Sequence, residues 1–304
     1  MKLRVAVTGS SGFIGRHVVA TLAARGDTAV GIRRPFEPRE LSDAFRGVDV
    51  IVHLAGVVSA VSDAAFVDGN VRTTRLVAAA AAEAGRRLVH VSSVAAAGPA
   101  PPSAPRAESD PPNPITTYGR TKLAGEMEVQ QMPQLRWTIL RPGVVYGPGD
   151  RALLPLFRFA RRGVVPLVGN PAAAYTFIYI DDAVRAILAA VERDLDGETI
   201  FVGHPVPVSP RVLLESITDV LRTHTLVIRV PRLVVRAAAM TGDLTGRLTG
   251  RPATVTSRRY VELYSSGFVC LVDRMTERLG ITAQVGLREG HTQAARWYAE
   301  QGLL

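Results

Sequence analysis

The chain has 304 residues, 47% hydrophobic and 21% charged, which is the composition of an ordinary globular protein. Its net charge of +9 comes from dispersed arginines with only 6% aromatic residues, so we expect no nucleic-acid partner. No run reaches the roughly 20 apolar residues of a membrane span, and a predicted strand at the N-terminus leaves no room for a signal peptide, so we expect a cytoplasmic location.

The chain has one cysteine, Cys270, and six histidines, which are scattered along the sequence. A single cysteine forms no internal disulfide, and the histidines lack the spacing of metal ligands. We therefore expect no metal.

The first stretch of the chain predicts a nucleotide-binding turn. Residues 3–7 are rich in β-branched side chains, as in a buried parallel strand, and apolar residues at helical spacing follow over 13–22. Gly9, Gly12 and Gly15 lie between them, where a dinucleotide pyrophosphate would meet bare backbone and a helix N-terminus. A glycine-rich turn of purely structural purpose remains the alternative.

Arginines follow the second predicted strand, Thr28–Ile32. An acidic residue at this point would bind the adenosine ribose, whereas arginine suits a 2′-phosphate. Arg33 and Arg34 therefore favour NADP over NAD, unless they lie in a solvated turn without a ligand.

Strands and helices continue to alternate. Helices are predicted over 40–46 and 63–84, and strands over 48–54 and 87–93. This alternation indicates a doubly wound parallel α/β sheet, whose strands all end at one edge. Ala55 and Gly56 should therefore lie near the glycine turn and the serines that end the fourth strand.

A proline-rich loop over 98–114 precedes a helix predicted over 117–132. Tyr118 and Lys122 are four residues apart, so they share one face of this helix. Tyrosine titrates near 10, and both a neighbouring ammonium and a bound nicotinamide would lower that pKa. We expect Tyr118 to transfer a proton at a substrate oxygen that Ser93 holds.

The second half of the chain is also α/β. Strands are predicted over 137–140, 175–180, 199–202 and 226–230, and helices over 151–162, 209–222, 234–250, 273–279 and 287–301. A further helix is predicted to run to Arg193, with Asp181 and Asp182 as its N-cap. We expect a Rossmann domain over 1–165, partly completed by 176–203, and a smaller substrate domain over 166–304, with the active site between them.

Taken together, these motifs resemble the extended short-chain dehydrogenases/reductases, in the NAD(P)-dependent epimerase/dehydratase and 3β-hydroxysteroid-dehydrogenase-like group. The resemblance covers nearly the whole chain. The matching segments are Thr8–Gly15, Asp49–Ala55, Asn70–Val71, Val91–Ser93, Tyr118–Lys122, Arg141–Asp150, Phe177–Asp182 and Trp297–Tyr298 with Gly302.

The resemblance implies a Rossmann-like fold with Tyr118 as acid/base, Lys122 as its partner and Ser93, rather than Ser92, as donor to the substrate oxygen. It places Asn70 near the site, either in a water relay or as a structural support. A homodimer through helices 63–84 and 115–132 is possible by the same analogy. The cofactor contacts it implies are Gly9, Ser11, Gly12, Phe13, Ile14, Gly15, Arg33, Arg34, Leu54, Ala55, Gly56, Lys122, Pro142 and Val144.

The chain departs from the family pattern in a shortened segment between Arg34 and Asp49, where a strand and its adenine-contacting aspartate are expected to be vestigial or absent. Nucleotide-sugar enzymes of the family place diphosphate donors where this chain has Gly143, Val144, Tyr175 and Thr176. A diphosphate buried without such donors is poorly compensated.

We therefore expect hydride transfer between NADP, or NAD, and a secondary alcohol or ketone of a fairly apolar small molecule. One alternative is a nucleotide-sugar epimerase or dehydratase, with Arg211, Arg251 or Arg258 binding phosphate. A second alternative is a non-catalytic NADP-sensing protein.

Overall fold

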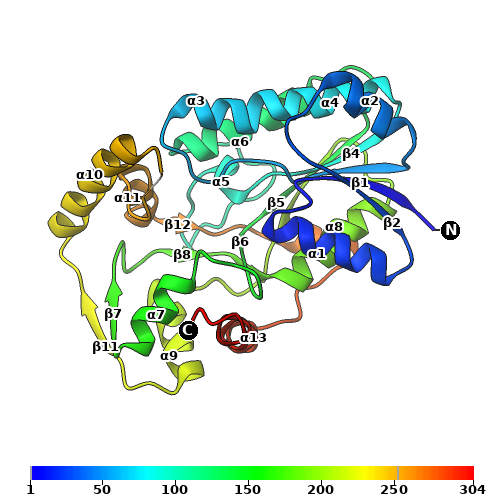
Figure 1. The fold of residues 1–304 in the computed structure, drawn as a ribbon. Helices are drawn as coiled ribbons and strands as arrows, with labels where there is room; N and C mark the ends of the chain where they lie inside the picture. The colour runs from blue at the N-terminus through cyan, green and yellow to red at the C-terminus, as the bar shows by residue number, and fades with distance from the viewer. Residues whose placement is uncertain (1, 252) are drawn as a thin grey trace.

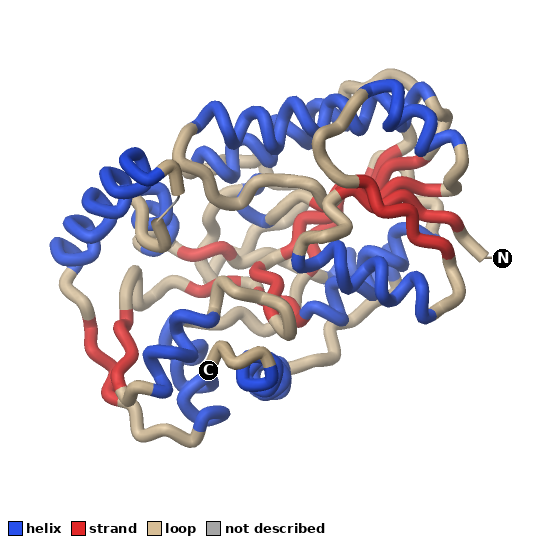
Figure 2. The backbone as a smooth tube through the Cα atoms, viewed as in Figure 1, coloured by secondary structure: helices blue, strands red, loops and turns tan. Residues whose placement is uncertain are grey.

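A six-stranded parallel sheet forms the centre of the fold in the computed structural model, which describes residues 2–251 and 253–304 (Figures 1 and 2). Its strand order is β10-β5-β4-β3-β1-β2. The strands are β1 (Arg4–Thr8), β2 (Thr28–Ile32), β3 (Val50–His53), β4 (Arg87–Val91), β5 (Trp137–Pro142) and β10 (Glu198–Val202).

Helices cover both faces of this sheet because side chains alternate between two apolar cores. Val5, Val7 and Val52 face the core shared with α1 (Phe13–Ala24) and α8 (Ile180–Glu192). Ala6 and Ile51 face the core on the opposite side. That side is covered by α2 (Pro38–Arg46), α4 (Thr73–Glu83) and α6 (Thr117–Gln130), which lie above the sheet in Figure 1. The predicted doubly wound α/β fold is confirmed.

The long helical stretch predicted over 63–84 contains a local irregularity. It consists of α3 (Asp63–Phe66), a π-helical turn η1 (Val67–Arg72) and then α4. Such turns widen a helix by one residue and are frequent at functional sites. Asn70 lies in this turn.

The shortened segment after the second strand behaves as expected. Between Ile32 and Val50 the regular structure is α2 alone, and β3 pairs directly with β1. The expected loss of a strand here is confirmed.

The remaining elements form three two-stranded sheets and a set of helices on one side of the molecule. The small sheets pair β6 with β9, β7 with β11 and β8 with β12. These strands are β6 (Val144–Tyr146), β7 (Val164–Leu167), β8 (Ala174–Tyr175), β9 (Phe177–Tyr179), β11 (Leu226–Arg229) and β12 (Gly267–Phe268). The helices are α5 (Val94–Ala97), α7 (Leu154–Arg161), α9 (Pro210–Leu221), α10 (Arg232–Thr249), α11 (Ser257–Leu263), α12 (Asp273–Leu279) and α13 (Leu287–Glu300).

The predicted N-cap at Asp181 and Asp182 is wrong. Helix α8 begins at Ile180, with Tyr179 at its N-cap, so both aspartates lie inside its first turn. Asp182 is buried there and accepts hydrogen bonds from the backbone N–H groups of Gln284 and Val285, each at 2.9 Å. Its carboxylate therefore holds a distant chain segment against α8.

No helix in residues 2–251 and 253–304 is long and apolar enough to cross a bilayer.

Candidate active site

The glycine turn at the end of β1 is packed too tightly for side chains. Gly9 has φ +72°, and its carbonyl accepts a hydrogen bond of 2.9 Å from the N–H of Gly12. A Cβ on Gly15 would lie 2.1 Å from the Gly9 oxygen, and one on Gly9 would lie 2.7 Å from the Ala55 nitrogen. These contacts bring α1 close to β1 and to the chain after β3.

The first turn of α1 carries the features of an anion site. Its N-cap, Gly12, supplies no capping side chain, and no acidic residue lies in the first turn. Unpaired N–H groups and the helix dipole therefore point out of the turn. Together with the bare glycine backbone, this arrangement fits a dinucleotide pyrophosphate.

The segment after β3 joins the glycine turn to the catalytic residues expected from the sequence. The Leu54 N–H donates to the Thr8 carbonyl at 3.1 Å, which places Ala55 beside Gly9. A Cβ on Gly56 would lie 3.9 Å from Lys122 Nζ. Residues 54–56 thus lie between the glycine turn and α6.

Tight helix packing brings Tyr118 to Ser93. Ser93 caps α5 by accepting a hydrogen bond of 3.2 Å from the Ala95 N–H, and Thr116 caps α6 through the Gly119 N–H. A Cβ on Gly119 would lie 2.4 Å from the Ala95 oxygen, so only glycine lets α6 approach α5 this closely. Tyr118, in the first turn of α6, consequently lies near enough to Ser93 for the serine hydroxyl to lower its pKa.

Lys122 lies one turn further along α6 and is buried. Its Nζ donates a hydrogen bond of 2.9 Å to the Val91 carbonyl at the end of β4. Burial lowers the pKa of Lys122 to about 8, against a smaller raising effect of the Glu126 carboxylate.

The pKa of the Tyr118 phenol differs from the value expected from the sequence. Burial raises its pKa above 10, the Ser93 hydroxyl lowers it, and the Glu262 carboxylate raises it further. The predicted net lowering of this pKa is therefore wrong for the chain without its cofactor, because the loss of hydration outweighs the lowering by Ser93. At neutral pH Tyr118 carries its proton.

Asn70 connects three elements below the site. Its Oδ1 accepts from the Val57 N–H at 2.7 Å, while its Nδ2 donates to the Val57 carbonyl at 3.0 Å and to Thr121 Oγ1 at 3.1 Å. These bonds fasten the loop after β3 to η1 and α6. They give Asn70 the supporting role that the sequence left open beside a water relay.

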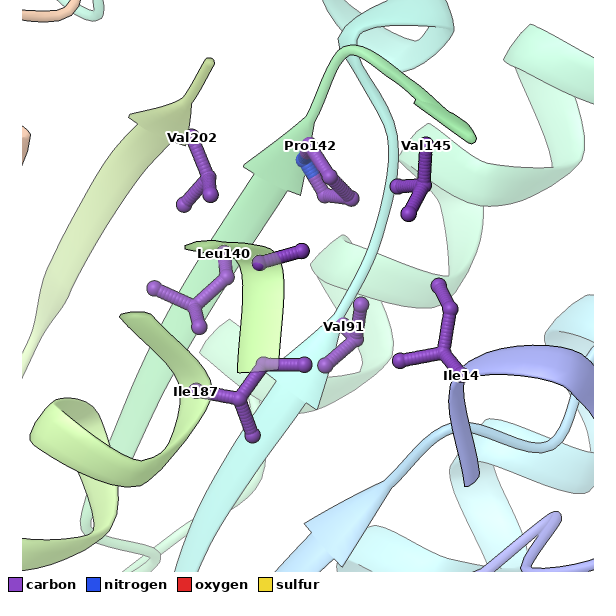
Figure 3. A pocket seen from close by; sticks show the side chains of 8 residues that line it. Ile14, Val91, Leu140, Pro142, Val145, Ile187 and Val202 are labelled. Carbon is purple, nitrogen blue, oxygen red and sulfur yellow. The ribbon is translucent and has the colours of Figure 1, made fainter. Parts of the chain in front are cut away.

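Apolar side chains from both halves of the sequence surround a small gap beside Ile14, in the first turn of α1 (Figure 3). Ile14 faces Val91, Pro142 and Val145 around a gap of about 10 Å³, which is too small for a ligand. Ser11 is exposed at the turn, whereas Phe13 packs edge-on against the His17 ring. Val144 lies in β6, paired with Phe177.

Arg33 and Arg34 are exposed directly after β2. The Arg34 guanidinium donates to the Gly69 carbonyl at 2.9 Å and lies over the Phe36 ring. Arg34 is thus anchored beside η1, at the end of the strand that follows the glycine turn.

Two carboxylates near the site were not identified from the sequence. Glu126, fully buried on α6, forms a bidentate ion pair with Arg141, with N–O distances of 2.6–3.2 Å. Glu262, on α11, accepts from Thr116 Oγ1 at 3.3 Å and acts on the pKa of Tyr118. The only local signal for α11 is its N-cap, Thr256, which accepts from the Arg259 N–H.

The fold and the glycine turn define a Rossmann-type nucleotide-binding protein, with serine, tyrosine and lysine gathered at the same sheet edge. A sequence profile of the NAD dependent epimerase/dehydratase family matches residues 5–203, and the chain belongs to this family, among the extended short-chain dehydrogenases/reductases.

The chain is similar over almost its whole length to two reductases. It is 29% identical to the ceramide reductase of Caulobacter vibrioides, over 99% of this chain and 96% of the relative. It is also 29% identical to the 4-hydroxy-2-methyl-3-oxo-4-farnesyl-3,4-dihydroquinoline-1-oxide ketoreductase of Stigmatella aurantiaca, over 95% and 94%.

Nucleotide-sugar enzymes share the fold. The structure of MoeE5 in complex with UDP-glucuronic acid and NAD superposes with a TM-score of 0.77 at 24% identity, over 98% of this chain and 99% of that one. The relatives thus include both reductases and nucleotide-sugar epimerases, and the chain is an NAD-dependent enzyme of the extended short-chain superfamily.

Proposed function

We propose that the protein reduces a ketone on an apolar, lipid-like small molecule to a secondary alcohol, and reverses this reaction, with NADP as cofactor. The observation that carries the proposal is the placement of Tyr118 against Ser93, with buried Lys122 one turn away, at the edge that holds the glycine turn. When bound, the nicotinamide supplies or accepts the hydride.

The protein's own groups manage the proton. The Tyr118 phenol, protonated at neutral pH, donates its proton to the alkoxide that develops when a ketone is reduced. The Ser93 hydroxyl donates a hydrogen bond to the same oxygen and orients it. The Lys122 ammonium, fixed by the Val91 carbonyl, adds positive charge beside this developing anion. Neutral pH therefore favours the reductive direction.

The substrate class follows from what the site lacks and from the relatives. A Cβ on Gly143 would lie 2.2 Å from the Thr176 oxygen, so no diphosphate-binding side chain fits there. The two nearly full-length reductase relatives are named for ceramide and for a farnesylated quinoline. Both observations support an apolar carbonyl compound.

Arg33 and Arg34 support NADP. They stand where a ribose-binding carboxylate would disfavour a 2′-phosphate, and Arg34 is anchored toward the site by Gly69. A guanidinium binds a phosphate oxygen pair in a fixed geometry.

A groove of about 530 Å³ favours a second candidate, a nucleotide-sugar epimerase or dehydratase. It is lined by Asn170, Arg229 and Arg232, which suit a diphosphate. Two arginines suggested for this role are engaged elsewhere, since Arg258 pairs with Asp63 and Arg211 with Glu215.

The test combines cofactor binding with turnover. NADPH should bind tightly by fluorescence titration, and Tyr118→Phe should lower reduction of apolar ketones about 10²–10⁴-fold with cofactor affinity unchanged. Replacing Arg33 and Arg34 by Ser should weaken NADPH about tenfold or more and leave NADH unaffected. Calorimetric binding of UDP-glucose without ketone turnover would instead support the epimerase candidate.

A further inference from the structure

Helix α10 presents an unusual surface. Four large apolar side chains recur on one stripe of this helix and are exposed: Leu233 at 77%, Met240 at 62%, Leu244 at 59% and Leu248 at 78%. The spacing of seven, four and four residues keeps them on one face. Exposed leucines are ordinary singly, but a continuous stripe of them marks an interaction surface.

The inward face of α10 is made of small residues. Val235, Ala239 and Gly246 are buried, and a Cβ on Gly242 would lie 2.0 Å from the Val255 oxygen. The helix therefore packs closely on the segment that leads into α11 and turns its large side chains away from the protein. It lies at the outer end of the molecule, beside α11 (Figure 1).

Exposed apolar side chains also occur in β11, which immediately precedes α10 in the chain. Leu226, Val227 and Ile228 are exposed at 64%, 45% and 46%. Eight of the 18 large hydrophobic residues that are exposed in the described chain thus fall within residues 226–248. This concentration defines what we call the α10 face: Leu226, Val227, Ile228, Leu233, Val234, Met240, Leu244 and Leu248.

Positive charge borders the α10 face. Arg236 and Arg247 lie beside Met240 and Leu244 at helical spacings of four and three, and Arg229, Arg232 and Arg251 flank the ends. The one acidic residue of α10, Asp243, turns inward and accepts from the Ser257 N–H at 3.3 Å. The arginine stems can lie along apolar surface while their guanidinium groups reach a polar boundary.

We propose that the α10 face docks on the surface of an anionic lipid bilayer. An apolar stripe bordered by arginines matches the boundary between acyl chains and anionic headgroups. A second copy of this chain is a poorer occupant. Two α10 helices packed antiparallel about their midpoints would bring Arg236 against Arg247, without a carboxylate between them.

Docking in this way connects the bilayer to the catalytic groups. Helix α11, on which α10 rests, carries Glu262 beside Thr116 and Tyr118. Docking would therefore hold Tyr118 on the membrane side of the molecule, separated from the bilayer by α11 and α10, and close to the source of a lipid ketone dissolved in the bilayer. The identity of the lipid ketone as substrate rests on the proposed function, whereas the docking of the protein on the bilayer does not.

Vesicle flotation tests the docking. We expect the protein to float with vesicles of phosphatidylcholine containing about one-third phosphatidylglycerol, more weakly with phosphatidylcholine alone, and less as salt rises. Leu244→Glu and Leu248→Glu should each lower the partition coefficient about tenfold or more. Arg236→Gln with Arg247→Gln should lower it about tenfold on the anionic vesicles.

The controls separate docking from folding and from catalysis. Val212→Glu, at an exposed apolar position on α9, should float like the wild type. Turnover of a water-soluble ketone should be equal in all these variants, because the α10 face touches no catalytic group. Flotation with no turnover would overturn the proposed function but not the docking.

Two results would overturn the docking. One is equal flotation of the wild type and the leucine variants. The other is failure of the wild type to float with either vesicle; if sedimentation velocity then shows a dimer that Leu244→Glu dissociates, the α10 face is instead a contact between two copies.

Discussion

Lys122 is exceptional in a chain that uses arginine for nearly every cation, with 34 arginines and two lysines. Its ammonium is buried and rests on a neutral carbonyl, not on a carboxylate. An arginine would stay charged over the whole physiological pH range, and its planar guanidinium is larger than the compact ammonium of lysine. The position therefore combines a required charge with a poor environment for it.

Lys122→Met should reveal the free energy lost in burying this charge. Because the native pKa is about 8 and the unfolded pKa is near 10.5, the unfolded state binds more protons between these values, and wild-type stability rises with pH across that window. Between pH 7 and pH 10 the wild type should gain up to about 3 kcal/mol relative to Lys122→Met in urea unfolding.

Lys2→Met, at an exposed position, provides the matched control and should follow the wild type. If the free energy of unfolding of the wild type and of Lys122→Met changed equally with pH, the free-energy cost assigned to burying this ammonium would be contradicted.

Sequence spacing predicted the proximity of those candidate-site residues that are close along the chain or at strand ends. The glycine turn and the Tyr118–Lys122 pair belong to this group, since local geometry sets their positions. Glu126 and Glu262 could not be found in this way, because their importance depends on Arg141 and Thr116, which approach them only after folding. The raised pKa of Tyr118 could not be predicted from the sequence for the same reason, because burial is a property of the packed protein.

At the scale of elements, two neighbouring strands place a pair of histidines inside the sheet. His53 on β3 and His90 on β4 are in register, and their rings stack with centroids 5.1 Å apart. Thr8 and Thr74 hydrogen-bond the two ring nitrogens of His53, whereas both nitrogens of His90 are buried and have no hydrogen-bond partner among the residues that the structure describes. Burial, assisted by the Lys122 charge, lowers the pKa of His53 to about 3 and that of His90 well below 6.5.

His90→Phe should make the protein more tolerant of acid. Below pH 6.5 the histidines of the unfolded chain bind protons, whereas His53 and His90 in the native protein stay neutral because their pKa values are lowered. Wild-type stability therefore falls as pH falls. The phenylalanine ring keeps the stacking and should reduce the stability lost between pH 6.5 and pH 4 by at least about 1 kcal/mol in urea unfolding. His224→Phe, an exposed change, should leave the loss as it is; an unchanged loss in His90→Phe would contradict the argument.

Several elements were predicted closely, among them β2, α12 and α9. Short elements were missed, including β6, β7, β12 and α11. These elements have no periodic pattern of their own, and they form because a partner segment is already in place. Helix α11 has no buried residue, so its sequence has no amphipathic spacing from which the helix could be predicted.

At the scale of the whole molecule, Arg258 joins the α11 region to the nucleotide-binding half. Its guanidinium pairs with Asp63 at 2.6 Å, donates to the Ala60 carbonyl at 3.2 Å and lies over the Phe66 ring at 5.5 Å. Thr116, through Glu262, and Asn170, through the Ser265 carbonyl, also hold the α11 region, but Arg258 combines an ion pair, a backbone hydrogen bond and a ring contact in one side chain.

Arg258→Ala should loosen this connection without unfolding the sheet. Hydrogen exchange should accelerate in residues 57–63 and 257–263, while β1, β3 and β4 exchange at the wild-type rate. Arg211→Ala, a change at an exposed ion pair on α9, should alter neither region. Equal exchange in Arg258→Ala and the wild type would show that other contacts hold α11.

The scarcity of lysine also makes the molecule unusually selective toward amine-directed reagents. Lys2 is exposed, whereas Lys122 is shielded at the centre of the site and is about half unprotonated near pH 8. Acylation should therefore modify Lys2 quickly and Lys122 slowly. The slow reaction would count unoccupied sites, because a nucleotide covering Gly56 would protect Lys122 and leave the reaction of Lys2 unchanged.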